Sequence, residues 1–189
     1  MPTSVFNAMI YIVNAFTSLY LLVLLLRFWL PIIRADFRNP IAQGIFRLTS
    51  PLIVPLRRLL PSIGKIDTAS IFVSLIFQFL TILILLYISG RSFNSLQILS
   101  SSIIRLIMLS INIFTFAIFI RVLMSWLSPP GYYNPITSIA ISLSEPLLRP
   151  LKKVIPILGG MDLTPVFAII FLVTINILIS GLLPVGIII

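Results

Sequence analysis

Residues 39–67 read NPIAQGIFRLTSPLIVPLRRLLPSIGKID, and residues 134–162 read NPITSIAISLSEPLLRPLKKVIPILGGMD. The two segments align without a gap at an offset of 95 residues, from position 39 to position 134. The matching positions are prolines, basic residues, a glycine, and the polar residues that begin and end each segment: Asn39/Asn134, Pro40/Pro135, Pro51/Pro146, Pro55/Pro150, Arg57/Lys152, Arg58/Lys153, Pro61/Pro156, Gly64/Gly159 and Asp67/Asp162. Composition alone does not produce a constant offset over so many special positions. The chain therefore contains an internal duplication.

The duplication extends upstream of these two segments, which we call the motif segments. Arg27 corresponds to Arg121 at an offset of 94, so the second copy has one extra residue before its Asn-Pro. We predict two tandem repeats, residues 1–95 and 96–189.

Composition places the chain in a membrane. Of its 189 residues, 59% are hydrophobic and 9% are charged, and the mean hydropathy is +1.20, which exceeds what a soluble fold can bury. Four apolar stretches, residues 5–30, 69–88, 103–127 and 165–188, are each long enough to cross a hydrocarbon core of ~30 Å at ~1.5 Å per residue. The predicted fold class is an all-α membrane protein with four transmembrane helices, the second and third joined by a polar loop at 89–102.

The motif segments are too short and too polar to cross the bilayer. Asn39 and Asn134 are preferred N-cap residues, and Pro40 and Pro135 suit the first helical position, where no hydrogen bond is lost. Apolar residues then recur on one helical face, which predicts interfacial amphipathic helices. In the first segment the predicted face consists of Ile41, Ile45, Leu48 and Leu52. We expect the later prolines to break each segment into short pieces.

Two copies of this pattern, each between apolar segments, resemble the YggT family of small bacterial membrane proteins, with YlmG-type relatives in plastids. The resemblance covers nearly the whole chain. The second copy departs from the pattern at Glu145, which replaces the Ser before Pro146, and in its Lys-Lys pair. The resemblance implies a bacterial inner-membrane protein linked to osmotic and cation homeostasis, or to division and membrane organisation.

Charge predicts the topology. With two spans per repeat, both copies have the same orientation, so both motif segments lie on one side. Nine basic residues lie in or beside the motif segments, whereas only Arg91 and Arg105 belong to the other side. The positive-inside rule then places the motif segments in the cytoplasm and both termini in the periplasm.

The net charge of +9 also bears on partners. The basic residues alternate with apolar segments, which suits anionic lipid headgroups better than direct binding of nucleic acid. Arg57, Arg58, Lys152 and Lys153 are the predicted contacts to anionic lipid or to a protein partner. Their alternative role is to mark orientation only.

The chain lacks the side chains of the common catalytic sites. It has no His and no Cys, and its only carboxylate side chains are Asp36, Asp67, Glu145 and Asp162. We expect no enzymatic activity, no cofactor and no metal site.

Arg27 and Arg121 lie inside the apparent ends of their spans, and Asp67 and Asp162 open the spans that follow. We predict that Arg27 pairs with Asp67, or Arg121 with Asp162, in at least one repeat. Snorkelling of the arginines to lipid phosphates is the alternative.

Two functions stay open at this point. The first is a non-enzymatic protein that organises the membrane or cytoplasmic partners. The second is an ion channel or cation-uptake component, for which four spans would require a homo-oligomer to enclose a pore.

Overall fold

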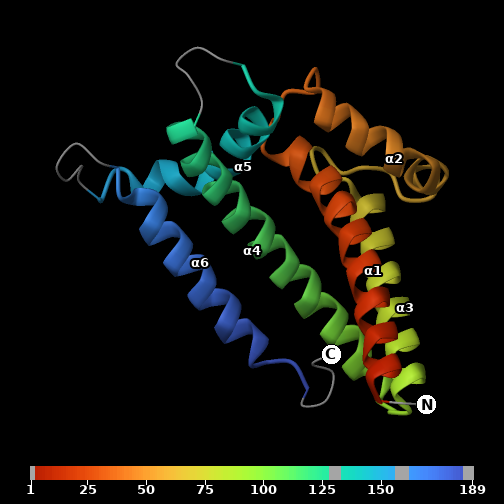
Figure 1. Ribbon diagram of the computed structural model, residues 1–189. Helices are drawn as coiled ribbons and strands as arrows, with labels where there is room; N and C mark the ends of the chain where they lie inside the picture. Colours follow the sequence, from red (N-terminus) through yellow and green to blue (C-terminus); the bar gives the residue numbers. More distant parts are fainter. Residues whose placement is uncertain (1–2, 128–132, 156–161, 185–189) are drawn as a thin grey trace.

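The computed structural model describes residues 3–127, 133–155 and 162–184, and within these ranges the chain forms six helices. They are α1 (Thr3–Ile32), α2 (Pro40–Arg57), α3 (Thr68–Ser89), α4 (Ser95–Leu127), α5 (Pro135–Leu151) and α6 (Thr164–Ser180). Helices α1, α3, α4 and α6 run along one another, and α2 and α5 cross them at one end (Figure 1). The start of α1 and the end of α6 lie at the opposite end of the molecule. We call the end that carries α2 and α5 the motif end, and the other the distal end.

Three helices, α1, α3 and α4, are long and apolar enough to cross a membrane. Helix α6 is equally apolar but has only 17 residues, since it ends at Ser180. The predicted fourth span, residues 165–188, is thus longer than the helix, and its last four residues lie outside the described ranges.

The prediction of a loop at 89–102 is wrong in its second half, because α4 begins at Ser95. The amide of Asn94 donates to the side-chain oxygen of Gln97 at 3.1 Å, which is half of a capping box. Helix α4 therefore starts well before its apolar stretch, and Arg105 lies about three turns inside it rather than at its end.

The prediction that prolines break the motif segments is also wrong. Helix α2 runs unbroken through Pro51 and Pro55, and α5 runs through Pro146 and Pro150. In both helices the two prolines are four residues apart, so they share one side, and all four are exposed. Carbonyl groups left without an amide donor on that side can bind water or lipid headgroups instead, which lowers the cost of each proline.

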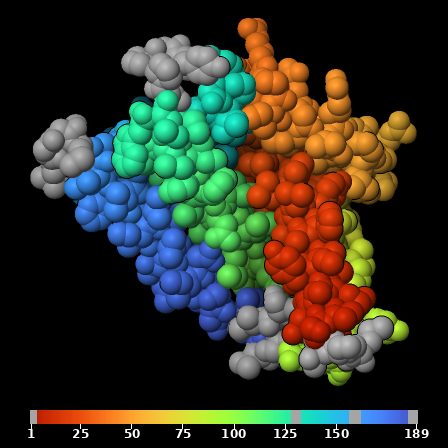
Figure 2. Space-filling model, viewed as in Figure 1, coloured from red at the N-terminus to blue at the C-terminus, as the bar shows by residue number. Residues whose placement is uncertain are grey.

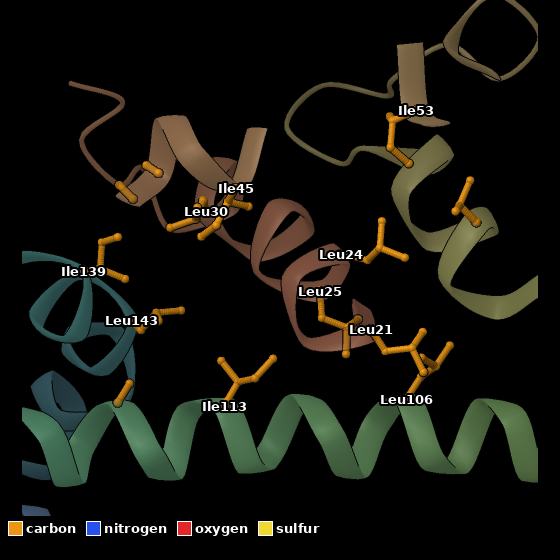
Figure 3. Close-up of a cluster of buried hydrophobic side chains, with 14 of the residues drawn as sticks. Leu21, Leu24, Leu25, Leu30, Ile45, Ile53, Leu106, Ile113, Ile139 and Leu143 are labelled. Atoms are coloured by element: carbon orange, nitrogen blue, oxygen red, sulfur yellow. The ribbon is translucent and has the colours of Figure 1, made fainter. Parts of the chain in front are cut away.

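The main core lies where the second half of α1 meets the motif helices and α4 (Figure 3). It is built from apolar side chains of five helices: Leu21, Leu24, Leu25 and Leu30 of α1, Ile45 and Ile53 of α2, Ala69 and Val73 of α3, Leu106 and Ile113 of α4, and Ile139 and Leu143 of α5. The buried side of α2 differs from the predicted one, since Leu48 and Leu52 are exposed while Ala42 and Ile53 are buried. Helix α2 therefore has a second apolar surface that faces away from the protein.

Candidate functional site: an arginine-centred ionic cluster

Arg27 is the largest fully buried side chain of the described residues, with 2% of its surface exposed. The packing of α1 against α2 and α3 encloses it. Its Nη1 donates to three oxygens of α2, which are Thr49 Oγ1 at 2.7 Å, the Phe46 carbonyl at 3.1 Å and Ser50 Oγ at 3.3 Å. The guanidinium carbon also lies 4.9 Å from the centre of the Phe46 ring, within range of a cation–π contact. The guanidinium thus fastens α1 to α2.

Asp67 connects the same cluster to α3. Its Oδ2 accepts from Arg27 Nε at 3.4 Å, from Arg57 Nη2 at 2.5 Å and from Ser70 Oγ at 2.8 Å. Its Oδ1 accepts from Arg57 Nε at 3.3 Å. We call Arg27, Thr49, Arg57 and Asp67 the Arg27 cluster. It joins three helices of the first repeat, and the carboxylate lies between two arginines.

The surroundings of Asp67 keep its carboxyl group ionised. Burial alone would raise the pKa of Asp67, but the hydrogen bonds from Arg57 and Ser70 and the charges of Arg57 and Arg27 hold that pKa below its usual range. Asp67 is the N-cap residue of α3, but its side chain accepts no hydrogen bond from the backbone of that helix. Both of its oxygens serve the arginines and Ser70 instead.

The second repeat arranges the matching residues differently. Arg121 Nη1 donates to Ser144 Oγ at 3.0 Å and to Glu145 Oε2 at 2.8 Å. Asp162 instead pairs with Lys152 at 3.1 Å and accepts from the amide of Thr164 at 3.0 Å. The direct pair Arg27–Asp67 is therefore present in the first repeat, and Arg121–Asp162 is not formed in the second.

One sequence difference explains this change of partner. Ser144 occupies the position of Thr49, so the hydroxyl contact to the arginine is common to both repeats. Glu145 occupies the position of Ser50, and its carboxylate reaches Arg121 before Asp162 can. The hydrogen bond from Arg121 lowers the pKa of Glu145, and that from Thr164 lowers the pKa of Asp162.

All four residues of the basic pairs are exposed, and the first residue of each pair also forms an ion pair. Arg57 and Lys152 each pair with the aspartate of their own repeat, although 41% of each side chain stays exposed. Arg58 and Lys153 are exposed. The contact of all four residues with lipid or a partner stays a prediction, and Arg57 and Lys152 would make it in addition to their ion pairs.

The Asn-Pro pairs begin both motif helices. Asn39 Oδ1 accepts from the amide of Ile41, and Asn134 Oδ1 accepts from the amide of Ile136, each at 2.9 Å, with Pro40 and Pro135 at the first helical position. Asn39 Nδ2 also donates to the carbonyl of Pro135 at 2.8 Å. This bond links the two repeats at the motif end, where α2 contacts α5.

Sequence reasoning missed Thr49, Ser144 and Ser70 as partners of the charged groups. The small hydroxyl at matching positions 49 and 144 is visible in the alignment of the repeats and could have been found. Ser70 has no such counterpart, since Pro165 takes its place. Among the described residues, no group of three metal-binding side chains lies together.

Comparison with known proteins supports the assignment made from the motifs. The sequence model of the CCB3/YggT family matches the chain twice, at residues 6–88 and 100–183. The chain is 43% identical over 175 residues to the uncharacterized protein PA0392 of Pseudomonas aeruginosa, covering 92% of this chain and 88% of that protein. It is 34% identical over 170 residues to protein YggT of Escherichia coli K12, covering 90% and 88%. A protein of Vibrio alginolyticus is 35% identical over 161 residues, covering 84% and 85%. No solved structure matches the chain.

Proposed function

The chain belongs to the CCB3/YggT family, and we propose that it is a non-enzymatic, four-span protein of the bacterial inner membrane that organises lipids and proteins at the cytoplasmic surface. In this proposal α6 is the fourth span, and the two repeats have the same orientation. The process served is osmotic-stress adaptation or division, as the family resemblance implies.

The observation that carries the proposal is the common position of the two motif helices. Helices α2 and α5 lie at the same end of the molecule and contact each other, with Asn39 hydrogen-bonded to Pro135 across the repeats. Together they form a surface that we call the platform. The motif helices and the basic pairs at their ends are held by three ion pairs and by the Asn39 and Asn134 caps, which suits helices that keep a fixed shape for a partner.

The exposed side chains of the platform suit the membrane surface. Leu59 and Val154, which follow the basic pairs, are 78% and 79% exposed. Arg58 and Lys153 are exposed beside them. An apolar side chain next to a cation is the composition of helices that lie among anionic headgroups, where each basic residue contributes ~1 kcal/mol.

Photo-crosslinking of the full chain in native membranes tests this proposal. A photoreactive amino acid is placed at Leu59 or Val154, and at Tyr87 of the distal end as the matched control, since Tyr87 is 90% exposed. We expect crosslinks to a cytoplasmic protein from the first two positions only, and more crosslinks to anionic lipid from them than from Tyr87. Identical products from all three positions would contradict a platform.

Ion conduction is the second candidate, and one cavity favours it. A cavity of about 690 Å³ lies between α1, α3 and α4 in the distal half, lined by amide and hydroxyl side chains and Arg105 among apolar side chains. An arginine repels cations, so the cavity favours an anion over the cation path considered from the sequence. Reconstitution into liposomes with anion- and cation-sensitive dyes tests this alternative, which requires flux that depends on the protein.

A further inference from the structure

The two repeats do not pack symmetrically. In the internal duplication, α1 corresponds to α4 and α3 corresponds to α6. Helix α3 of the first repeat packs against α4 of the second. A symmetric molecule would therefore pack α6 against α1. Within the described residues α6 makes no comparable contact with α1, and Figure 2 shows the surface of α4 between those of the other two helices.

Two cavities follow this open side of the molecule, and together they form what we call the groove. The cavity of about 690 Å³ occupies the distal half, and a second cavity of about 710 Å³ occupies the half near the motif end. Leu109 and Asn112 of α4 line both of them, so the groove is continuous along α4.

The distal half of the groove carries many polar side chains among apolar ones such as Met108. Asn7, Tyr11, Asn14 and Ser18 of α1 are spaced so that they share one helical face, and all four line the cavity. Helix α3 contributes Gln78 and Thr81, and α4 contributes Arg105. Side-chain amides, hydroxyls and a guanidinium together supply many hydrogen-bond donors at membrane depth.

The half near the motif end is apolar. Its lining comes from Leu22 and Leu26 of α1, Ile113 and Phe116 of α4, and Ile139 of α5, among others. A ligand that fits the whole groove must therefore be polar and anionic at its distal end and apolar at the other.

We propose that the groove binds one anionic phospholipid of the leaflet opposite the platform, with its phosphate at Arg105 and an acyl chain along α4. Arg105 lines the distal half of the groove together with Gln78 and Thr81 of α3. It is ten residues from the start of α4, about 15 Å, and it follows directly after the serine-rich first turns, at the edge of the apolar stretch. A guanidinium has five N–H donors, so it can bind a phosphate alongside contacts within the protein.

The amides extend this assignment inwards. Asn14 lies on α1 one turn beyond Tyr11, toward the motif end. Asn112 lies two turns beyond Arg105 on α4, also toward the motif end. Their NH₂ groups can donate to the ester carbonyls of a lipid, which lie below its phosphate. The apolar half then accepts the chain.

A second copy of this chain suits the groove less well. All four acidic side chains, Asp36, Asp67, Glu145 and Asp162, lie at the motif end or in the segments that adjoin it. A second copy with the same orientation therefore brings no Asp or Glu to Arg105. A phosphate provides the negative charge that such a copy cannot.

Native mass spectrometry of the full chain, extracted from vesicles of equal phosphatidylglycerol and phosphatidylcholine, tests the proposal. We expect one phosphatidylglycerol retained at an activation energy that removes other lipids. Arg105→Gln should weaken that retention at least about tenfold, the factor for loss of one charge-assisted hydrogen bond. Arg91→Gln is the matched control, because Arg91 lies at the same end but does not line the groove.

A second variant keeps the test decisive if Arg105→Gln fails to fold. Ser18→Phe fills the groove from an exposed position of α1 and should abolish retention of the lipid. Arg58→Gln with Lys153→Gln, at the platform, should leave it unchanged. Four results would each overturn the proposal. The wild type could retain phosphatidylcholine as well as phosphatidylglycerol, or Arg91→Gln could weaken phosphatidylglycerol retention as much as Arg105→Gln does. Ser18→Phe could leave lipid retention unchanged, or it alone could dissociate a dimer.

Discussion

Replacement of Asp67 by Asn should destabilise the protein far more than the same replacement of Asp162. Asp67→Asn keeps the shape of the side chain but removes the negative charge that lies between Arg27 and Arg57. Arg27 is then left buried, at 2% exposure, without its counter-charge. Removal of one partner of a buried ion pair costs about 3–5 kcal/mol.

The structure places the expected cost near the lower end of that range. Arg27 keeps its hydrogen bonds to Thr49 and the Phe46 carbonyl, and Arg57 is exposed enough to be hydrated. We therefore expect a loss of about 3 kcal/mol. In Asp162→Asn the broken pair with Lys152 is 41% exposed on both sides, and such pairs are worth about 0–1 kcal/mol.

Equilibrium unfolding in mixed detergent–lipid micelles measures both losses. Trp29 is a suitable reporter, because it follows Arg27 by two residues in α1. Its Nε1 donates a hydrogen bond to Ser110 of α4, so its fluorescence should report the loss of this packing. Trp126→Phe leaves Trp29 as the only tryptophan and changes an exposed position. If Asp67→Asn costs less than about 1 kcal/mol, or if the two variants cost the same, the Arg27 cluster does not hold the repeat together.

Three further predictions concern the same contacts. Asn134→Ala should cost about 1 kcal/mol as the loss of an N-cap, whereas Asn39→Ala should cost about 1 kcal/mol more, because it also breaks the bond to the Pro135 carbonyl; thermal unfolding in micelles compares them. The pKa of Asp67 is lower in the folded chain than in the unfolded chain, where it is about 4. The stability that Asp67 contributes is therefore present above the unfolded pKa and is lost as the pH falls through the folded pKa. Acid unfolding of Asp67→Asn should accordingly depend less on pH than that of the wild type. The charge swap Arg27→Asp with Asp67→Arg should recover little of the stability that either single change loses, because an Arg at position 67 cannot reproduce the bonds from Arg27 to α2; recovery to the wild-type midpoint would show that the ion pair acts alone.

The sequence predicted an Arg–Asp pair in at least one repeat because a buried cation needs a partner, and because both repeats supply an aspartate at the start of the next span; the pair forms between Arg27 and Asp67. It did not predict the partners in the second repeat. There the single change from Ser50 to Glu145 puts a carboxylate on the motif helix itself, next to the Ser144 that contacts Arg121, whereas Asp162 lies beyond the end of that helix. Two nearly identical motifs thus form two different ionic clusters.

Other differences have separate physical causes. The early start of α4 was open to prediction, because Asn94 and Gln97 have the spacing of a capping box. The unbroken helix α2 was not, because the cost of Pro51 and Pro55 depends on whether their side of the helix is buried. The groove could not be predicted from the sequence either. It exists because α3 packs against both α1 and α4 whereas α6, in the part of the chain that the structure describes, does not pack comparably against α1, and the similar hydropathy of α3 and α6 gives no sign of this difference.

The chain contains no cysteine, so single cysteines can be introduced one at a time without background. Labelling of Lys65→Cys and Lys153→Cys with a membrane-impermeant maleimide, compared with Asn94→Cys, measures the side on which each motif helix lies. The proposed architecture predicts that the first two positions label only after the cytoplasmic side is opened, and that Asn94→Cys labels in intact cells. Labelling of Lys65→Cys and Lys153→Cys from opposite sides would contradict a shared platform.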